Sequence, residues 1–205
     1  MIIKKNIAMR ALVSEIASLL VLLGLMTAAR SSLADHYHVP SGSMEYTLMP
    51  GDRVLVDKTA YGFRIPLTTI DLFGDERPQR GDVAVFDSPR DGRRLIKRIV
   101  AVGGDVVSIE NGLLTVNGEA LHTPVGEHAA FERFGDTEAH LNLEHGGGPD
   151  LPAQRVPDGM VLAVGDHRGN SLDGRHWGFV PETELYGKAV AVFYRRGEGF
   201  TWRTL

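Results

Sequence analysis

Residues 93–102 read RRLIKRIVAV, a run of apolar and β-branched residues with a lysine near its centre. Such a run predicts a buried β-strand. Lysine is rarely buried without a partner, so Lys97 is the residue to explain. Because successive side chains of a strand point to opposite faces, we expect Lys97 to point inward and Arg98 to point out to solvent. The opposite orientation, with Arg98 inside and Lys97 solvated, fits the pattern equally well.

An inward-facing Lys97 would have unusual acid–base chemistry. Burial disfavours the charged form of the amine, so its pKa should fall below the usual value of ~10.4. A fall of roughly two to three pKa units would make Lys97 a usable general base near neutral pH.

Hydroxyl groups that such a base might activate occur in HVPSGSMEYTL, residues 38–48, where two serines surround a glycine at the end of an extended stretch. An ordinary turn would use the same residues. The chain has no G-x-S-x-G motif, and no S-x-x-K motif arises here because Met44 and Tyr46 stand three residues after the serines. Lys97 therefore remains the candidate base.

The rest of the chain after residue 35 consists of short alternating apolar runs separated by Gly, Pro and Asn, which predicts a mostly β fold of antiparallel sheets. The expected strands are RVLVDK (53–58), DVAVFD (82–87), LIKRIVAV (95–102), DVVSIE (105–110), LLTVNG (113–118), MVLAVGD (160–166) and KAVAVFYR (188–195). Asn111-Gly112 and Asn117-Gly118 are typical of tight hairpin turns.

Residues 119–157 differ from this pattern, with scattered His and Glu and a GGGP stretch at 146–149. We interpret them as an insertion or cap on a β domain that spans 36–205. A partly disordered loop is the alternative.

The N-terminal segment 11–29 reads ALVSEIASLLVLLGLMTAA and is almost entirely apolar. As a helix it would be about 28 Å long, close to the thickness of a bilayer core, which predicts a transmembrane anchor. Lys4, Lys5 and Arg10 precede it, so the positive-inside rule leaves residues 1–10 in the cytoplasm and exports the remainder.

A cleaved signal peptide is the competing interpretation of this segment. Ser32 and Ala34 have the small-x-small spacing of a cleavage site. Both interpretations place the β domain on the exported side of the membrane.

Composition excludes several classes of function. The formal net charge is −4 and no basic block follows the N-terminus, so we expect no nucleic-acid partner. The chain has no cysteine, which excludes disulfides, thiol catalysis and Cys-ligated zinc. Its eight histidines form no H-E-x-x-H motif, and His36 and His38 supply only two ligands on one strand face. We expect no metal site on these residues.

Three ordered motifs resemble those of the bacterial type I signal peptidases, the membrane-bound Ser–Lys proteases of family S26. The motifs are PSGSMEYTL (40–48), RGDVAVFDSP followed by LIKRIVAVGGD (80–89 and 95–105), and GDHRGNSLDGRHWGFVP (165–181). With their spacing they span most of residues 36–194. The resemblance implies the signal-peptidase β fold and cleavage of exported preproteins at the lipid bilayer, after small residues of Ala-x-Ala-like sites. It implies neither a metal nor an organic cofactor.

The resemblance also assigns site residues. It implies that Ser43 is the nucleophile, that Lys97 is the general base, and that the Ser43 N–H and the Ser41 hydroxyl form the oxyanion hole. Supporting roles fall on Ser171, which would hydrogen-bond the Lys97 amine, and on an ion pair of Asp173 with Arg175. Substrate binding in extended form, with shallow pockets for small side chains, falls on Tyr37, Val39, Pro40, Met44, Leu95 and Ile96.

Some positions depart from the family pattern. Tyr46 replaces a common proline, so we expect the turn after the nucleophile to be less fixed. His167, Gly169 and Gly174 replace the usual Asn, Asp and Ser. Gly169 therefore lacks a side chain that would brace the loop carrying Ser171.

The stretch YGFRIPLTTIDLF, 61–73, is apolar for a loop, which indicates either a covered strand or an exposed surface in contact with lipid. The side chains expected at the bilayer interface are Phe63, Ile65, Leu67, Leu72 and Phe73.

Other functions compete with general signal-peptide removal. A self-cleaving repressor-type regulator would need a DNA-binding domain, where this chain has an export segment. A peptidase that matures pilins for conjugative transfer would have the same motifs. A catalytically inactive, membrane-tethered module that binds exported peptides is the alternative from another class.

Overall fold

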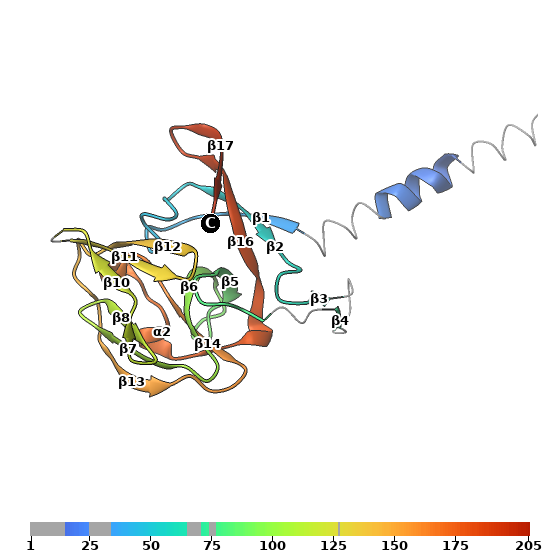
Figure 1. The fold of residues 1–205 in the computed structure, drawn as a ribbon. Helices are drawn as coiled ribbons and strands as arrows, with labels where there is room; N and C mark the ends of the chain where they lie inside the picture. Colours follow the sequence, from blue (N-terminus) through green and yellow to red (C-terminus); the bar gives the residue numbers. More distant parts are fainter. Residues whose placement is uncertain (1–14, 25–33, 65–70, 74–76, 127) are drawn as a thin grey trace, which may run out of the picture.

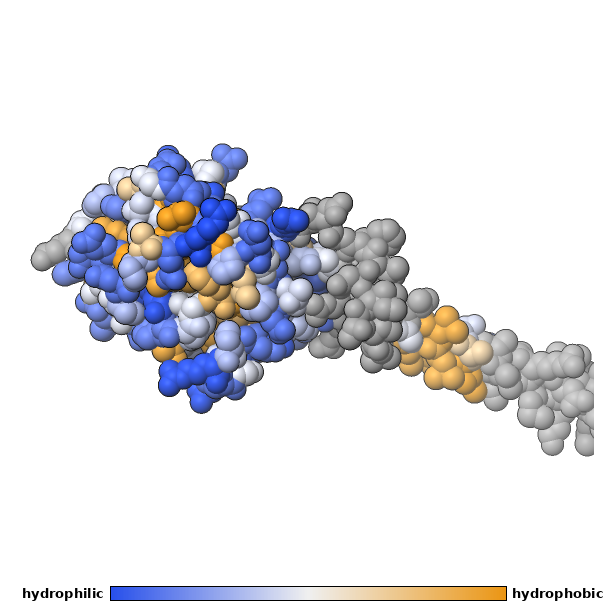
Figure 2. All heavy atoms as spheres, turned by 90° about the horizontal axis from the view of Figure 1, so that it is seen from below, coloured by the Kyte–Doolittle hydropathy of each residue, from blue (hydrophilic) through white to orange (hydrophobic). Residues whose placement is uncertain are grey.

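The computed structural model describes residues 15–24, 34–64, 71–73, 77–126 and 128–205. Residues 15–24 are helical and exposed, and Figure 2 shows this helix as mostly apolar while the β domain has a largely polar surface in that view. Among the described ranges, no helix is both long enough and apolar enough to cross a bilayer.

Two predictions from the sequence extend beyond the described part of the chain. The proposed anchor at 11–29 continues past the described helix at both ends. Of the side chains expected at the lipid interface, Ile65 and Leu67 lie outside the described residues. Phe63, Leu72 and Phe73 are described in their backbone alone.

The largest sheet has eight strands, and its neighbouring strands are antiparallel. Their order is β1 (Ala34–His38), β2 (Arg53–Asp57), β16 (Leu185–Arg195), β5 (Val83–Asp87), β6 (Arg94–Val102), β14 (Met160–Val164) and β15 (Val180–Pro181), with β17 (Gly199–Thr204) paired to β16. In Figure 1, β16 runs the length of the domain and β17 returns along it.

Two smaller sheets are built mainly from the middle of the chain. One has the order β13 (Leu151–Arg155), β7 (Val106–Glu110), β8 (Leu113–Val116) and β9 (Glu119–Ala120), and the other has the order β10 (His122–Pro124), β11 (Ala129–Phe134) and β12 (Thr137–Asn142). Figure 1 shows both beside the central strands β6 and β14. Residues 119–157 are therefore largely folded, and the alternative of a partly disordered loop is wrong.

The remaining elements are short. They are the hairpin of β3 (Phe63–Arg64) with β4 (Asp71–Phe73), the 3₁₀ helices η1 (Arg168–Asn170) and η2 (Glu182–Glu184), and the helix α2 (Gly174–Trp177). Each strand predicted from sequence is present, within a few residues of the expected bounds. The hairpin turns are also as expected, since Asn111 and Asn117 have φ of 51° and 53° and a glycine with positive φ follows each.

The central position of strand β6 in the sheet explains why two adjacent basic residues are both buried. This strand lies between β5 and β14, and both of its faces are covered, since Ile99 and Val100 belong to different hydrophobic clusters and are both fully buried. Lys97 and Arg98 are consequently both buried, at 3% and 2% exposure. The expectation that Arg98 points into solvent is wrong, because a central strand covered on both faces has no solvent side.

Candidate active site

The two candidate serines lie in the turn that follows β1, residues 39–52. Two backbone hydrogen bonds close this turn, from Val39 N to Asp52 O (2.9 Å) and from Gly51 N to Val39 O (2.8 Å). Met44 and Leu48 anchor it, because both side chains are fully buried in the hydrophobic core. The turn therefore holds the backbone between its anchors next to β6.

Ser43 and Lys97 meet at this point. The Nζ atom of Lys97 lies 2.5 Å from the Oγ atom of Ser43, within hydrogen-bonding distance. Both side chains are buried, Ser43 at 8% and Lys97 at 3% exposure. The amine is thus held against one hydroxyl in a setting with little access to water.

The buried environment of Lys97 shifts its acid–base equilibrium toward the neutral form. Burial lowers its pKa from 10.5 to about 8, although the negative charges of Asp173 and Asp166 act in the opposite direction. Each of these carboxylates is paired with a buried arginine, Asp166 with Arg98 and Asp173 with Arg175. A neutral amine beside a hydroxyl can accept its proton, which is the requirement for general-base activation.

Arg98 connects the central sheet to the turn of residues 39–52, named the nucleophile turn after its candidate nucleophile Ser43. Its guanidinium donates two hydrogen bonds to Asp166, at 2.9 and 2.8 Å, and one to Gly81 O at 2.7 Å. Thr47, in the turn, donates to the same carboxylate of Asp166 at 2.5 Å. The buried charge is therefore fully partnered, and it connects the turn to the loop that follows β14.

The loop after β14 packs directly on the nucleophile turn. An added Cβ at Gly165 would lie 2.2 Å from Ser171 Oγ and 2.5 Å from Ser43 O, so only glycine fits between them. The Ser171 hydroxyl is buried, and no hydrogen bond joins it to Lys97. The structure brings Ser171 to the site, but without the hydrogen bond to Lys97 that the family resemblance implies.

Asp173 and Arg175 form the ion pair that the sequence predicts. Arg175 donates to both oxygens of the Asp173 carboxylate at 2.9 Å, and neither side chain is exposed. Burial alone would raise the pKa of Asp173, but the hydrogen bond and charge of Arg175 outweigh it and lower that pKa. Arg175 also donates to Arg168 O at 2.7 Å, so the pair holds the loop in shape.

The glycines that depart from the family pattern have physical reasons in this structure. A Cβ at Gly169 would lie 2.1 Å from His145 O, because the segment after β12 occupies the space of a side chain there. A Cβ at Gly174 would lie 2.7 Å from Leu162 and 3.0 Å from Ala163 O. Gly169 lacks the bracing side chain, as expected, and close backbone packing takes the place of that side chain in the loop carrying Ser171.

Tyr46 also has partners that the sequence does not reveal. Its ring lies 4.7 Å from that of His140, centroid to centroid, and its hydroxyl donates to Glu144 Oε1 at 3.0 Å. Both partners belong to the region between 119 and 157. These contacts join the turn after Ser43 to that region.

The oxyanion-hole candidates lie together in the turn. Ser41 Oγ is 3.5 Å from Ser43 Oγ, and Ser41 is exposed. The Ser43 N–H makes no hydrogen bond within the described ranges. Both donors are therefore close to the nucleophile, and the backbone N–H is available.

A small cavity of about 120 Å³ adjoins Ser43 and Lys97. Its other lining residues are Tyr37, His38, Val39, Pro40, Ser41, Val85, Arg94, Leu95 and Ile96. These include the predicted substrate-binding residues apart from Met44, which is fully buried in the core and does not line the cavity. Tyr37 accepts a hydrogen bond from Arg94 at 3.1 Å, which orients its ring at the rim.

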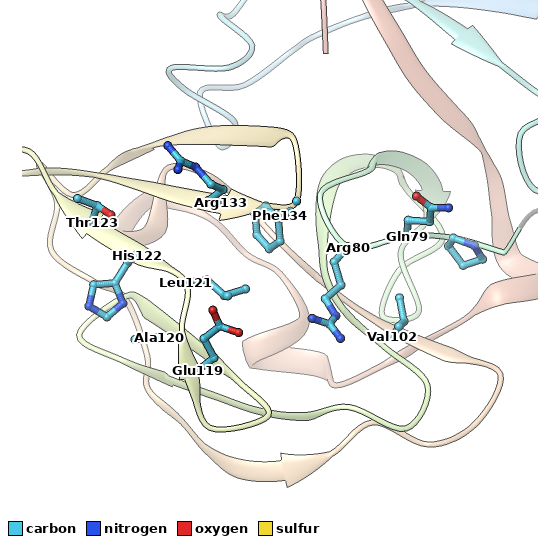
Figure 3. Close-up of a pocket in the computed structure, with 12 residues that line it drawn as sticks. Gln79, Arg80, Val102, Glu119, Ala120, Leu121, His122, Thr123, Arg133 and Phe134 are labelled. Carbon is cyan, nitrogen blue, oxygen red and sulfur yellow. The ribbon is translucent and has the colours of Figure 1, made fainter.

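A larger cavity, of about 700 Å³, lies between β9, β10, β11 and the segment before β5 (Figure 3). Figure 3 shows Glu119 and Leu121 on one side and Arg80 on the other, with Phe134 above the space between them. Arg80 is paired with Asp105 at 2.9 Å, and neither Ser43 nor Lys97 lines this cavity. The reactive pair therefore adjoins the smaller cavity.

The histidines and carboxylates of the described residues are not gathered into a larger cluster. No group of three or more His, Asp or Glu side chains among these described residues could hold an ion. His36 and His38 are exposed on the edge strand β1, as a surface role predicts.

A serine hydroxyl hydrogen-bonded to a buried lysine amine is the arrangement of serine hydrolases that use lysine as the base. Comparison with known proteins points to the same class of enzyme. The chain matches the family described as "Signal peptidase, peptidase S26" over residues 12–194. Signal peptidase I of Pseudomonas aeruginosa is 35% identical over 192 residues, covering 82% of this chain and 68% of that protein.

Two further relatives carry related names. The probable signal peptidase I-1 of Synechocystis is 34% identical over 188 residues, covering 88% of this chain and 81% of that protein. A crystal structure of a signal peptidase I from Enterococcus faecalis aligns at 29% identity and a TM-score of 0.40, over 56% of this chain and 97% of that one. The chain belongs to the signal peptidase family S26, a family of serine peptidases, as its motifs predict.

Proposed function

We propose that this protein is a membrane-bound serine endopeptidase that removes signal peptides from exported preproteins, with Ser43 as nucleophile and Lys97 as general base. The observation that carries the proposal is the 2.5 Å contact between the two side chains, combined with a lysine pKa of about 8. A substantial fraction of a lysine with this pKa is neutral near pH 7 to 8.

Acylation follows from the geometry. Neutral Lys97 Nζ accepts the proton of Ser43 Oγ, and the oxygen attacks the carbonyl carbon of the scissile peptide bond. The negative charge that develops on the carbonyl oxygen is stabilised by the Ser43 N–H and the Ser41 hydroxyl. The protonated amine then gives its proton to the leaving nitrogen, and the C–N bond breaks to leave an ester on Ser43.

Deacylation uses the same groups in the reverse order. Lys97 accepts a proton from a water molecule, whose oxygen attacks the ester carbonyl. The amine returns that proton to Ser43 Oγ as the C–O bond breaks, so the signal peptide leaves with a new carboxylate and the enzyme is restored. Asp173 and Arg175 act by holding the loop next to this pair.

Substrate choice follows from the small cavity beside Ser43. A cavity of about 120 Å³, lined mainly by Val39, Pro40, Val85, Leu95 and Ile96 beside Ser43, suits small apolar side chains such as alanine. The segment Tyr37 to Pro40 lies at this cavity, and an extended substrate would pair with its backbone. This is consistent with Ala-x-Ala-like cleavage sites.

Location follows from the N-terminal segment. We assign 11–29 as a transmembrane anchor with the N-terminus in the cytoplasm, which places the β domain on the exported side, where signal peptides emerge.

The proposal is tested with the full chain purified in detergent and a preprotein that carries an Ala-x-Ala site. We expect cleavage after the second alanine, identified by N-terminal sequencing of the mature product, and none with Ser43→Ala. A preprotein with phenylalanine in place of that alanine should resist cleavage. An inactive peptide-binding module would bind the preprotein without producing a mature product, and that result would refute the proposal.

A further inference from the structure

His167, in the loop between β14 and η1, contacts the nucleophile turn in a way that the predicted roles do not use. Its side chain is buried, at 2% exposure, and its Nδ1 atom lies 3.2 Å from Gly42 O and 3.0 Å from Glu45 Oε2. Its backbone N–H donates to Ser43 O at 3.2 Å. We propose that His167 is a positioning residue that orients the Ser43 N–H in the oxyanion hole, an inference that rests on the proposed function.

The hydrogen-bond partners of His167 assign its proton. Gly42 O and the Glu45 carboxylate can only accept hydrogen bonds, so Nδ1 must carry the hydrogen. The Glu45 side chain lies close under Gly42, because an added Cβ at Gly42 would come within 2.6 Å of Glu45 Oε1. Glu45 thereby keeps the Nδ1–H tautomer beside the Gly42 carbonyl.

Fixing the Gly42 carbonyl also fixes the Ser43 N–H. The two groups belong to one planar peptide unit, which is trans, so the N–H points away from His167 when the carbonyl points toward it. The next carbonyl, that of Ser43, is held by the backbone of His167. Both peptide groups that flank the nucleophile are therefore oriented by one residue.

A second histidine holds His167 in turn. His145 Nδ1 lies 2.9 Å from His167 Nε2, with the ring centroids 5.0 Å apart. Since His167 carries its hydrogen on Nδ1, a neutral His167 accepts at Nε2 from the Nδ1–H of His145. A parallel bridge between Asn142 and His167 adds a backbone contact from the same region. The inserted sequence after β12 thus takes part in positioning the oxyanion hole.

The expected effect is on the chemical step. An oxyanion donor is effective when it is already oriented at the carbonyl oxygen, and loss of one donor lowers kcat by about a hundredfold to a thousandfold. His167 acts through such a donor, so its loss should cost less, about tenfold to a hundredfold in kcat. The hydrogen bond to Gly42 O also polarises the peptide unit and strengthens its N–H as a donor.

The test compares His167→Asn, His167→Gln and His167→Leu with wild type, using kcat and KM for a preprotein substrate. The amide NH₂ of Asn sits where Nδ1 does and can donate to Gly42 O, whereas that of Gln sits where Nε2 does. We expect Asn to stay within about threefold of wild-type kcat and both other variants to fall about tenfold or more, with KM nearly unchanged. His122→Leu, in the larger cavity, is the matched control and should behave as wild type.

The kinetics of these variants either support or overturn the positioning role of His167. Wild-type kcat in His167→Leu, or an equal loss in the Asn and Gln variants, would overturn the inference, as would a rise in KM without a fall in kcat. If His167→Leu does not fold, the comparison of Asn with Gln still decides. Failure of the proposed function has a different signature, because wild type itself would then not cleave or Ser43→Ala would remain active.

Discussion

The Lys97 amine and the Ser43 hydroxyl are 54 residues apart in the chain, yet Nζ and Oγ lie 2.5 Å apart in a buried site. They meet because the Lys97 side chain, on β6, reaches Ser43 in the turn after β1. Burial of the amine on β6 then gives the pair its chemistry, since it lowers the pKa of Lys97 to about 8.

This pKa predicts the pH dependence of cleavage. Only the neutral amine can accept the Ser43 proton, so kcat/KM should rise about tenfold per pH unit below pH 8 and level off above it. Initial rates between about pH 5 and 9.5 would measure this, with thermal unfolding at each pH as a control for denaturation. A flat profile down to about pH 5 would exclude a lysine base.

The same burial predicts that Lys97 lowers the stability of the fold. Because the folded-state pKa of about 8 lies below the ordinary 10.5, the unfolded chain binds more protons between these values, and the free energy of unfolding rises with pH across that window. Below about pH 8 the amine is charged in both states, and the loss of folding stability caused by burying it is at its largest. Lys97→Met should therefore raise the free energy of unfolding at pH 7 by about 2 kcal/mol and abolish cleavage.

Denaturant unfolding of the two proteins at about pH 7 and pH 10 measures this stabilisation. The gain should shrink as the pH approaches the upper value. A Lys97→Met variant that is less stable than wild type at neutral pH would contradict a desolvated amine.

A buried ion pair links the inserted strands to the catalytic loop. Glu132 on β11 and Arg168 on η1 are both fully buried, and their closest contact is 2.5 Å. Removing one partner leaves an uncompensated buried charge, so Glu132→Leu should lower the free energy of unfolding by about 3–5 kcal/mol. The double variant Glu132→Leu/Arg168→Met should recover most of this loss, and purely additive effects in denaturant unfolding would argue against direct coupling.

Ser171 should influence catalysis more than stability. Its buried hydroxyl makes no hydrogen bond to Lys97, and the neighbouring Asp173 carboxylate keeps its bonds to Arg175 and Gly165 N in Ser171→Ala, so the loss of stability should be small. We expect an unchanged melting temperature and about a tenfold fall in kcat if this hydroxyl orients the Lys97 amine in the substrate complex. Wild-type kcat would leave Ser171 a packing role against Gly165.

The strands could be predicted from sequence because their alternation and their Asn-Gly turns are local signals. The orientation of Arg98 could not, because its partner Asp166 is 68 residues away and a one-strand pattern does not report cover on both faces. The same holds for Tyr46, whose partners His140 and Glu144 lie in a region with no strong periodicity.

In the candidate site, too, some residues could be predicted from sequence and others could not. Ser43 and Lys97 follow from motifs, but the contacts of His167 depend on His145, which lies outside the motifs, and on Glu45, to which the motif assigns no role. A buried position for His167 has no signature in a loop sequence. Residues that position other residues are thus harder to predict than residues that carry the chemistry.

The central claim is that Lys97 is the base for Ser43, and the most direct measurement is the cleavage rate of a preprotein by Lys97→Ala at about pH 9, where the wild-type amine is mostly neutral. The account predicts that wild type cleaves and that Lys97→Ala, although folded, forms no mature product. Cleavage by Lys97→Ala at a rate close to that of wild type would show that another group accepts the Ser43 proton.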